Sequence, residues 1–378
     1  MAAAWATHRI GAVACQIGHQ FNVPELVRQL DRVECKALFT CAPLAHIALE
    51  AAEVHGLPRE RIFIMDTSDK ILDGKTVPSD LKTVDQLIAE SANYPALEPV
   101  RMEKGEGASR IAYLCSSSGT SGMPKSVMIS HRNVIANIQA MTAFESGHKG
   151  PNPDVGLGVL PLSHIYGLCC VGHQGVFRGD NVVLLPSFDL IEVLQTIQNY
   201  KVFRTWFVPP MMIAMVKANH ICKKYDLSSI RHVVTGALPI PEKMMSEFGA
   251  LIPASTIVRV YGMTELSGIA TFGHPHDLMP GSVGNLMPGM TARLVSLEGE
   301  EIVDRGMPGN LLIHVRGAEP MGYLKNPEAT REMSPGDGWI RTGDLAEFRT
   351  NEKGEDHLII VDRVKEMIKV RVSVVPQR

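Results

Sequence analysis

Strand-like and helix-like segments alternate over the first two thirds of the chain, and this order strongly constrains the fold. Apolar runs typical of buried strands occupy residues 37–40, 62–65, 111–114, 155–160, 181–185, 205–208, 230–234 and 256–261. Segments with a helical spacing of apolar residues lie between many of them, and Asp189 is placed to cap one that extends to about Tyr200. Because helices that join successive strands form right-handed crossovers, the order predicts an α/β fold built on parallel sheets.

The pattern of the chain changes near residues 277–281. Beyond this point, short alternating strands with glycine turns follow one another, as in 309–316 and 358–361. Earlier in the chain, residues 66–108 are polar and irregular, which predicts a connection between sheets. We therefore expect an α/β body over residues 1–279, a small β-barrel-like module over 280–361 and a short remainder over 362–378.

The composition is that of a globular protein. The 378 residues are 45% hydrophobic and 20% charged, with a formal net charge of -3. This charge gives no reason to expect nucleic acid as a partner. The seven cysteines form no Cys-x-x-Cys pair, and their number is odd, which favours reduced thiols over a disulfide framework. Cys169 and Cys170 have no further ligands at the spacing of a metal site.

Targeting signals are not apparent in the sequence. The first 15 residues lack a basic start, and the end at Pro376-Gln-Arg378 is not a peroxisomal signal. The longest apolar stretch, 207–216, is too short for a membrane span and contains two prolines. We therefore expect a soluble, cytoplasmic protein.

A loop rich in serine and glycine begins at Cys115, with the sequence Cys-Ser-Ser-Ser-Gly-Thr-Ser-Gly-Met-Pro-Lys125. It follows the apolar run 111–114 and precedes a helix-like segment that starts near Ser130. Glycine amides, hydroxyl groups and a lysine are the groups that hold a phosphate at such a position. Pro124 stands where a Walker A motif needs its second glycine, so this motif is disfavoured. A flexible surface loop is the alternative interpretation.

The stretch from Ser117 to Lys125, Ser-Ser-Gly-Thr-Ser-Gly-x-Pro-Lys, resembles the signature loop of the adenylate-forming superfamily, which includes acyl- and aryl-CoA synthetases. The resemblance implies that Lys125 and the loop contact the phosphates of ATP. The loop residues concerned are Ser117, Ser118, Gly119, Thr120, Ser121 and Gly122.

A second motif, Val260-Tyr-Gly-Met-Thr-Glu265, lies at the end of the apolar run 256–261. Open α/β sheets bind their ligands at the carboxyl ends of strands. The resemblance implies that Tyr261, Gly262 and Thr264 contact the nucleotide and that Glu265 binds Mg²⁺. A carboxylate is a ligand that Mg²⁺ prefers, although an exposed Thr-Glu pair could also begin a helix.

Gly236-Ala-Leu-Pro239 follows the apolar run 230–234. The resemblance implies that Gly236, Ala237 and Leu238 pack against the adenine. Leu238 is larger than the residue usual in the superfamily, which predicts a narrower nucleotide pocket. A plain turn between a strand and a helix is the alternative.

Two motifs near the end of the chain imply a ribose site and a hinge. In Gly338-Trp-Ile-Arg-Thr-Gly-Asp344, the resemblance gives Asp344 the ribose hydroxyls. In the segment 361–369, it also places Arg363 at the ribose and Lys365 near the hinge between domains. Without the resemblance, these residues read as a Gly-Asp turn and as solvated surface charges.

The segment Leu160-Pro-Leu-Ser-His-Ile-Tyr-Gly167 resembles the motif whose histidine lines or gates the acyl pocket. A structural role for this histidine is the alternative. The candidate substrate residues are His164, Tyr166, Met263 and Ser267, and the candidate catalytic residues are Lys125, Thr264, Glu265 and His164.

The motifs occur in the order of the superfamily, and the chain is identified as a member most similar to the aryl/acyl-CoA ligase branch. The resemblance implies that Mg·ATP activates a carboxylic acid, aryl or medium- to long-chain acyl, as acyl-AMP. CoA then forms the thioester. A non-catalytic nucleotide- or acyl-binding protein and an inactive, shortened ligase remain alternatives.

The chain departs from the superfamily at both ends. Relatives carry a segment before the equivalent of Trp5 and a small C-terminal domain after the equivalent of Lys369, and we expect this chain to lack both. The C-terminal domain normally brings a lysine that stabilises charge on the α-phosphate, and it builds the CoA channel.

Overall fold

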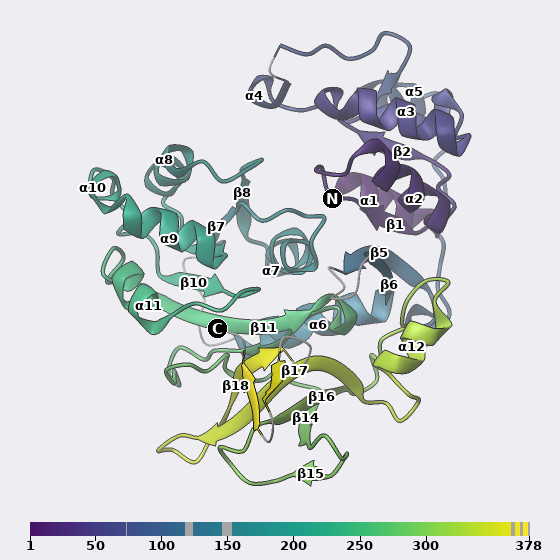
Figure 1. The fold of residues 1–378 in the computed structure, drawn as a ribbon. Helices are drawn as coiled ribbons and strands as arrows, with labels where there is room; N and C mark the ends of the chain where they lie inside the picture. The colour runs from purple at the N-terminus through teal and green to yellow at the C-terminus, as the bar shows by residue number, and fades with distance from the viewer. Residues whose placement is uncertain (73, 118–123, 146–152, 364–366, 371–372, 377–378) are drawn as a thin grey trace. The chain divides into compact units, whose positions relative to one another are not determined.

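The structure is a computed structural model that describes residues 1–72, 74–117, 124–145, 153–363, 367–370 and 373–376 (Figure 1). The chain divides into two compact units, residues 1–115 and residues 116–378. Each unit is described separately below.

The first unit contains short parallel strands and small helices. Its helices are α1 (Ala2–Arg9), α2 (Val23–Val33), α3 (Ala45–His55), α4 (Asp69–Leu72) and α5 (Val84–Ser91), with 3₁₀ turns η1 (Ala42–Leu44), η2 (Arg59–Arg61) and η3 (Glu106–Ala108). Its strands are β1 (Ala14–Gln16), β2 (Leu38–Thr40), β3 (Ile62–Ile64), β4 (Lys82–Thr83) and the first part of β5 (Ile111–Ser117). β1 pairs with β5, and β2, β3 and β4 form a second sheet, both parallel.

Residues 66–108 are less irregular than the sequence suggested, because α4, β4 and α5 lie within them. The start of α5 has a physical cause in a reciprocal cap. The Thr83 hydroxyl accepts a hydrogen bond from the backbone N–H of Gln86 at 3.1 Å, and the Gln86 side chain accepts one from the N–H of Thr83 at 2.9 Å. This Thr-x-x-Gln capping box was a local signal that our sequence reasoning missed.

A seven-stranded sheet organises the second unit, in the order β13-β12-β11-β10-β9-β7-β8. The strands are β7 (Val155–Gly158), β8 (Asn181–Leu184), β9 (Arg204–Phe207), β10 (His232–Thr235), β11 (Thr256–Met263), β12 (Gly268–Phe272) and β13 (Asn285–Leu286). The pairs from β8 to β11 are parallel, whereas β12 and β13 are antiparallel. The parallel part confirms the predicted α/β fold.

Helices connect these strands (Figure 1). They are α6 (His131–Phe144), the π-helical segment η4 (Gly167–Gln174), α7 (Gly175–Arg178), α8 (Leu190–Tyr200), α9 (Pro209–Lys217), α10 (Asn219–Cys222) and α11 (Glu242–Gly249). Asp189 caps α8 as predicted, since its side chain accepts a hydrogen bond from the backbone N–H of Glu192 at 2.9 Å. Apolar residues of α8, α9 and α11 form one core cluster with β7, β9 and β10, and Phe207 and Phe248 are fully buried in it.

A buried ionic network lies at one end of β7 and β9. Glu145, which ends α6, is hydrogen-bonded to Arg204 and accepts a hydrogen bond from Arg178 at 3.2 Å. Arg178 also donates to Asp154 at 2.7 Å and to Asp180 at 2.9 Å. Each of these five side chains is at most 5% exposed. The network therefore holds three carboxylates and two guanidinium groups in a site that excludes water.

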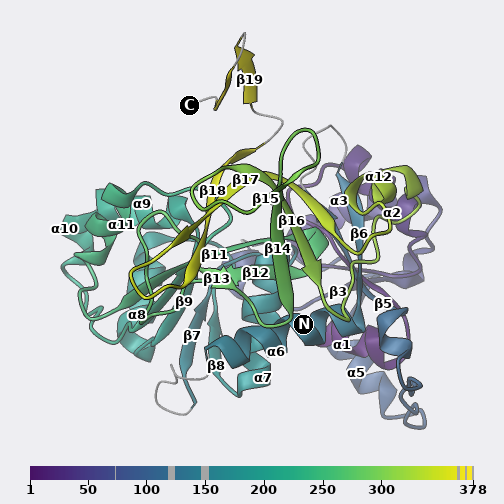
Figure 2. The same ribbon diagram turned by 90° about the horizontal axis from the view of Figure 1, so that it is seen from below.

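The chain ends in a β module (Figure 2). Strands β14 (Met290–Val295), β15 (Glu301–Ile302), β16 (Gly309–Val315), β17 (Ile340–Thr350) and β18 (Asp356–Arg363) form an antiparallel sheet in the order β15-β14-β16-β17-β18, with α12 (Pro327–Met333) between β16 and β17. β19 (Met367–Val370) and β20 (Ser373–Pro376) form a separate hairpin. The predicted strands over 309–316 and 358–361 are present. The predicted domain boundaries near 279 and 361 stay predictions.

The sequence predicts no membrane span, and the structure bears on this prediction through the length and hydropathy of its helices. Within the parts of the chain that the structure describes, no helix is long and apolar enough to cross a bilayer.

Candidate functional site

The candidate site lies where β11 ends, at the carboxyl edge of the parallel part of the sheet. β11 runs to Met263, the 3₁₀ turn η5 (Thr264–Leu266) follows, and β12 returns antiparallel to it. Only glycine fits at Gly262, because a Cβ there would lie 2.0 Å from the carbonyl oxygen of Gly268. This close approach places Thr264 and Glu265 at the end of the strand, where both are buried to 7% exposure. Ligands bind at such edges in open α/β sheets.

Tyr323, a residue that the sequence analysis did not identify, interacts with both Glu265 and Lys125. The Tyr323 hydroxyl donates to Glu265 Oε1 at 2.8 Å, and Lys125 Nζ lies 4.8 Å from the centroid of the Tyr323 ring. Burial, followed by the nearby Glu265 carboxylate, raises the pKa of Tyr323, so the phenol stays protonated as a donor. The dipeptide Gly322-Tyr323 is only a weak signal in the sequence, because no motif near it relates Tyr323 to Glu265.

Lys125 lies at the start of a strand that the sequence analysis did not predict, whereas the helix predicted to start near Ser130 is present. β6 (Lys125–Ser130) separates the loop from α6. The β-branched residues Val127 and Ile129 are buried to 1% and 0% exposure, and such residues favour a strand. Ser130 does begin the helix as its cap, with its hydroxyl accepting a hydrogen bond from the N–H of Asn133 at 3.0 Å.

Three residues of the predicted nucleotide set converge, although they are distant in sequence. The Tyr261 hydroxyl donates to Asp344 Oδ2 at 2.6 Å, and Arg363 Nε lies 3.5 Å from Asp344 Oδ1. Asp344 and Arg363 face each other in the pairing of β17 with β18. Burial, then Asp344, raises the pKa of Tyr261 well above its usual value, so this phenol is also a permanent donor.

Residues 236–238 form a constrained turn after β10. A Cβ at Gly236 would lie 2.6 Å from the carbonyl oxygen of Val260, and Ala237 has a positive φ of 71°. The turn therefore packs against the backbone of β11. Leu238 is 55% exposed. That this side chain narrows a nucleotide pocket stays a prediction.

The predicted substrate residues lie in two places, just before η4 and at or shortly after the end of β11. Burial lowers the pKa of His164, which keeps the imidazole neutral at pH 7, and its Nδ1 accepts a hydrogen bond from the N–H of Tyr166 at 3.2 Å. The Tyr166 hydroxyl donates to the carbonyl of Val234 at 3.0 Å, so it has a structural partner inside the sheet. Ser267 is 3% exposed with a φ of 61°. Roles for His164, Tyr166, Met263 and Ser267 in substrate binding stay predictions.

Part of the predicted site lies outside the described residues. These residues are Ser118, Gly119, Thr120, Ser121, Gly122 and Lys365. Ser117, at the end of β5, is described and is 6% exposed. Its hydroxyl has no hydrogen-bond partner among the described residues.

The oxygen ligands at the end of β11 suit a hard divalent cation. Glu265 is a buried carboxylate, and among the described residues its side chain accepts one hydrogen bond, from Tyr323, and has no ion-pair partner. A buried carboxylate without a cationic partner is costly. Mg²⁺ is held by one or two carboxylates, with water and phosphate oxygens completing its shell. The chemistry of Glu265 therefore suits such an ion.

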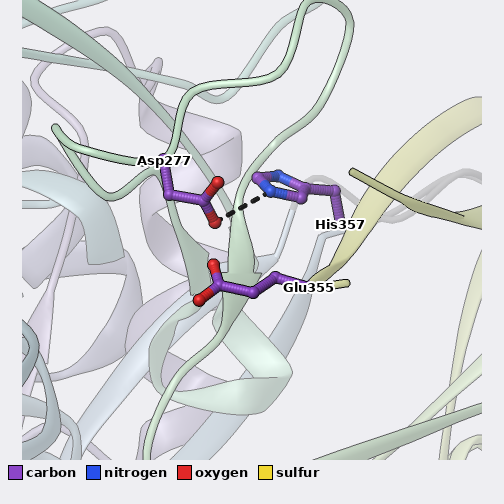
Figure 3. Close-up of side chains that lie close together, drawn as sticks. All are labelled: Asp277, Glu355 and His357. Atoms are coloured by element: carbon purple, nitrogen blue, oxygen red, sulfur yellow. Dashed lines mark hydrogen bonds and ion pairs between the residues drawn. The ribbon is translucent and has the colours of Figure 1, made fainter. Parts of the chain in front are cut away.

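A second polar cluster joins the segment after β12 to the hairpin of β17 and β18 (Figure 3). His357 Nε2 lies 2.9 Å from Asp277 Oδ2, and Asn351 donates to Asp277 Oδ1 at 2.5 Å. Burial by itself would raise the pKa of Asp277, but the hydrogen bond with Glu355 and the interaction with His357 outweigh it and lower the pKa. His357 and Asp277 are occupied by protein partners, so we assign the cluster a structural role.

Replacing Asp277 with asparagine should lower the free energy of unfolding by about 1–2 kcal/mol, because His357, which is 1% exposed, loses its charged partner. Since the folded pKa of Asp277 is lowered, this stabilisation is present above the unfolded pKa and is lost as the pH falls through the folded pKa. Urea unfolding at pH 7 measures the difference. Glu352→Gln, at an exposed position in the same turn and outside the cluster, is the control and should leave the midpoint nearly unchanged. Equal midpoints for Asp277→Asn and the control would contradict the structural role.

Comparisons with known proteins identify the family of the chain. The family model described as AMP-binding enzyme matches residues 1–324. Acyl-CoA ligase easD of Emericella nidulans is 36% identical over 369 residues, which cover 97% of this chain and 65% of the relative. Acyl-CoA ligase gloD of Glarea lozoyensis is 37% identical over 374 residues, which cover 98% of this chain and 65% of the relative. The chain thus spans 65% of the length of these curated relatives.

Solved structures support the same fold. The anthranilate CoA ligase AuaEII, in complex with anthranoyl-AMP, matches with a TM-score of 0.81 and 23% identity, over 97% of this chain and 66% of that one. This likeness concerns the fold alone. The family model, the curated relatives and the motifs at the end of β11 lead to one conclusion: the chain belongs to the AMP-binding enzymes of the adenylate-forming superfamily.

Proposed function

We propose that the chain is the nucleotide-binding and acid-activating part of an acid:CoA ligase. The carboxylate of an aryl or medium- to long-chain acyl substrate attacks the α-phosphate of ATP, which forms acyl-AMP and releases pyrophosphate. The sulfur of CoA then attacks the acyl carbon and displaces AMP. The observation that carries the proposal is the placement of Thr264 and the buried Glu265 at the carboxyl end of β11. The naming of curated relatives as acyl-CoA ligases supports the choice of CoA.

The nucleotide site follows from the residues around β11. Lys125 is a compact charge for the phosphates, together with Thr264 and the loop residues from Ser117 to Gly122. Asp344 and Arg363 bind the ribose, with Tyr261 fixing the carboxylate of Asp344. The turn of Gly236, Ala237 and Leu238 forms the adenine side.

Glu265 would hold Mg²⁺, which when bound neutralises charge on the phosphates of ATP. The chain's own contribution is to position the reacting groups and to keep donors aimed at the developing charge. A neutral His164 at the start of η4 borders the acid. Lys365 is proposed to lie at the hinge, and the domains are proposed to comprise 1–279, 280–361 and 362–378.

The test is pyrophosphate release from the purified 378-residue chain with Mg·ATP and a panel of aryl and fatty acids, with and without CoA. We expect release that depends on the acid, and thioester formation when CoA is added. Release without thioester would restrict the function to adenylation. Silence with every acid, combined with retained ATP binding in a thermal-shift control, would contradict catalysis and favour a nucleotide-binding protein.

A further inference from the structure

Tyr323 is held rigidly between the two charged groups of the candidate site. Val127 of β6 and Tyr323 form an antiparallel bridge, with the N–H of Met128 donating to the carbonyl of Gly322 at 2.9 Å. On the other side of the bridge, the N–H of Leu324 donates to the carbonyl of Ser126 at 2.8 Å. This pairing ties the backbone of Tyr323 to the strand that begins with Lys125.

The helix that follows adds a second restraint. The backbone N–H of Tyr323 donates to the Thr330 hydroxyl at 2.9 Å, and Thr330 lies in α12. Gly322 has a φ of 89°, and a Cβ there would lie 2.3 Å from Thr330 Cγ2, so no other residue fits this turn. Tyr323 itself is 8% exposed. Its ring therefore has little freedom to move.

The hydroxyl and the ring face of Tyr323 interact with two different charged groups. The hydroxyl donates to Glu265 Oε1 at 2.8 Å, which leaves Oε2 without a hydrogen-bond partner among the described residues. The face of the ring lies 4.8 Å from Lys125 Nζ, within the range of a cation–π contact. One buried side chain thus fixes both a carboxylate and an ammonium group.

We propose that Tyr323 is a positioning residue that holds Glu265 for a divalent cation and Lys125 for the phosphates. The proposal rests on the proposed function. A hydrogen bond to one carboxylate oxygen restricts the rotation of the carboxylate and leaves the other oxygen for the ion. The ring separates the lysine from the carboxylate, so the two opposite charges do not collapse into an ion pair and remain available to the nucleotide and its metal.

Two substitutions at this position separate the two roles. Tyr323→Phe keeps the ring and removes only the hydroxyl. We expect the affinity for Mn²⁺ in the presence of ATP, measured by the electron paramagnetic resonance of free Mn²⁺, to fall about 10–100-fold. ATP binding in EDTA, measured by calorimetry, should stay unchanged. Tyr323→Leu removes the ring as well, and it should also weaken ATP binding in EDTA.

The control is Tyr225→Phe, a partly buried tyrosine at the edge of the core cluster of β7, β9 and β10. It should bind Mn²⁺ and ATP like the wild type. Melting temperatures without ligand check that Tyr323→Phe is as stable as this control.

The outcomes distinguish the proposal from the proposed function. If the wild type binds ATP and Mn²⁺ and Tyr323→Phe binds Mn²⁺ equally well, positioning by Tyr323 is overturned. Equal weakening of ATP binding with Mn²⁺ and in EDTA also overturns it, because the hydroxyl then does not act through the metal ligand. A melting temperature of Tyr323→Phe well below that of the control overturns it as well, because the role is then structural. A wild type that binds no ATP overturns the proposed function itself.

Discussion

Replacing Arg204 with methionine should lower the free energy of unfolding by about 3–5 kcal/mol, because it leaves Glu145 buried with one of its two guanidinium partners removed. Arg204 is fully buried at the start of β9, and its guanidinium also lies 3.8 Å from Asp154. Arg178 alone would then face three carboxylates in a site without water. The midpoint of urea unfolding, compared with that of the wild type, measures the effect.

A second substitution identifies the cause of this loss. Combining Arg204→Met with Glu145→Gln removes a stranded charge, so the double variant should be more stable than Arg204→Met alone. Lys201→Met, which breaks the exposed pair with Asp226, is the surface control and should shift the midpoint little. Equal shifts of the midpoint for Arg204→Met and Lys201→Met would contradict the stabilising role of the buried ionic network.

Several helices and strands of the second unit were predictable because their signals are local. The strand predicted at 205–208 is β9, and the helix predicted after Asp189 is α8. An apolar run of four residues or a side-chain cap acts over one turn or less, so the sequence nearby contains the whole signal. The same reasoning missed the helix α5, although its capping box is equally local.

Contacts between distant segments could not be predicted in this way. Glu145 and Arg204 are 59 residues apart, and Tyr323 is 58 residues from Glu265. A charged residue in a sequence is first interpreted as exposed, and spacing alone does not show that Arg204 is fully buried. Only the pairing of strands and the folding of the β module bring such residues together.

The candidate site is intermediate between these cases. The sequence of 338–344 by itself indicates no more than a Gly-Asp turn, and the resemblance to a known superfamily is what gave Asp344 and Arg363 a common role. The structure does bring them together, through the pairing of β17 with β18. The resemblance did not include Tyr323, because it drew on the signature motifs and not on the side chain that connects two of them.

Replacing Glu265 with glutamine should reduce pyrophosphate release about 10²–10³-fold. The glutamine keeps the size of the side chain and an oxygen that can accept the hydrogen bond from Tyr323. It loses the negative charge, which is the property that binds a hard divalent cation. The expected factor is that of losing one preorganised electrostatic contact to the transition state, about 3–4 kcal/mol. Rates at saturating ATP and acid over a range of Mg²⁺ concentrations measure it.

A control substitution at another glutamate shows whether the loss of activity depends on the position of the removed charge. Glu242 pairs with Arg259 and is 54% exposed, so Glu242→Gln changes the same total charge outside the site. It should retain the wild-type rate at every Mg²⁺ concentration. If Glu265→Gln weakens metal binding alone, high Mg²⁺ should restore part of its rate, whereas a rate that stays low indicates that the carboxylate also orients the bound ion. An unchanged rate for Glu265→Gln would remove Glu265 from the metal site, because a carboxylate that binds the ion cannot lose its charge without effect.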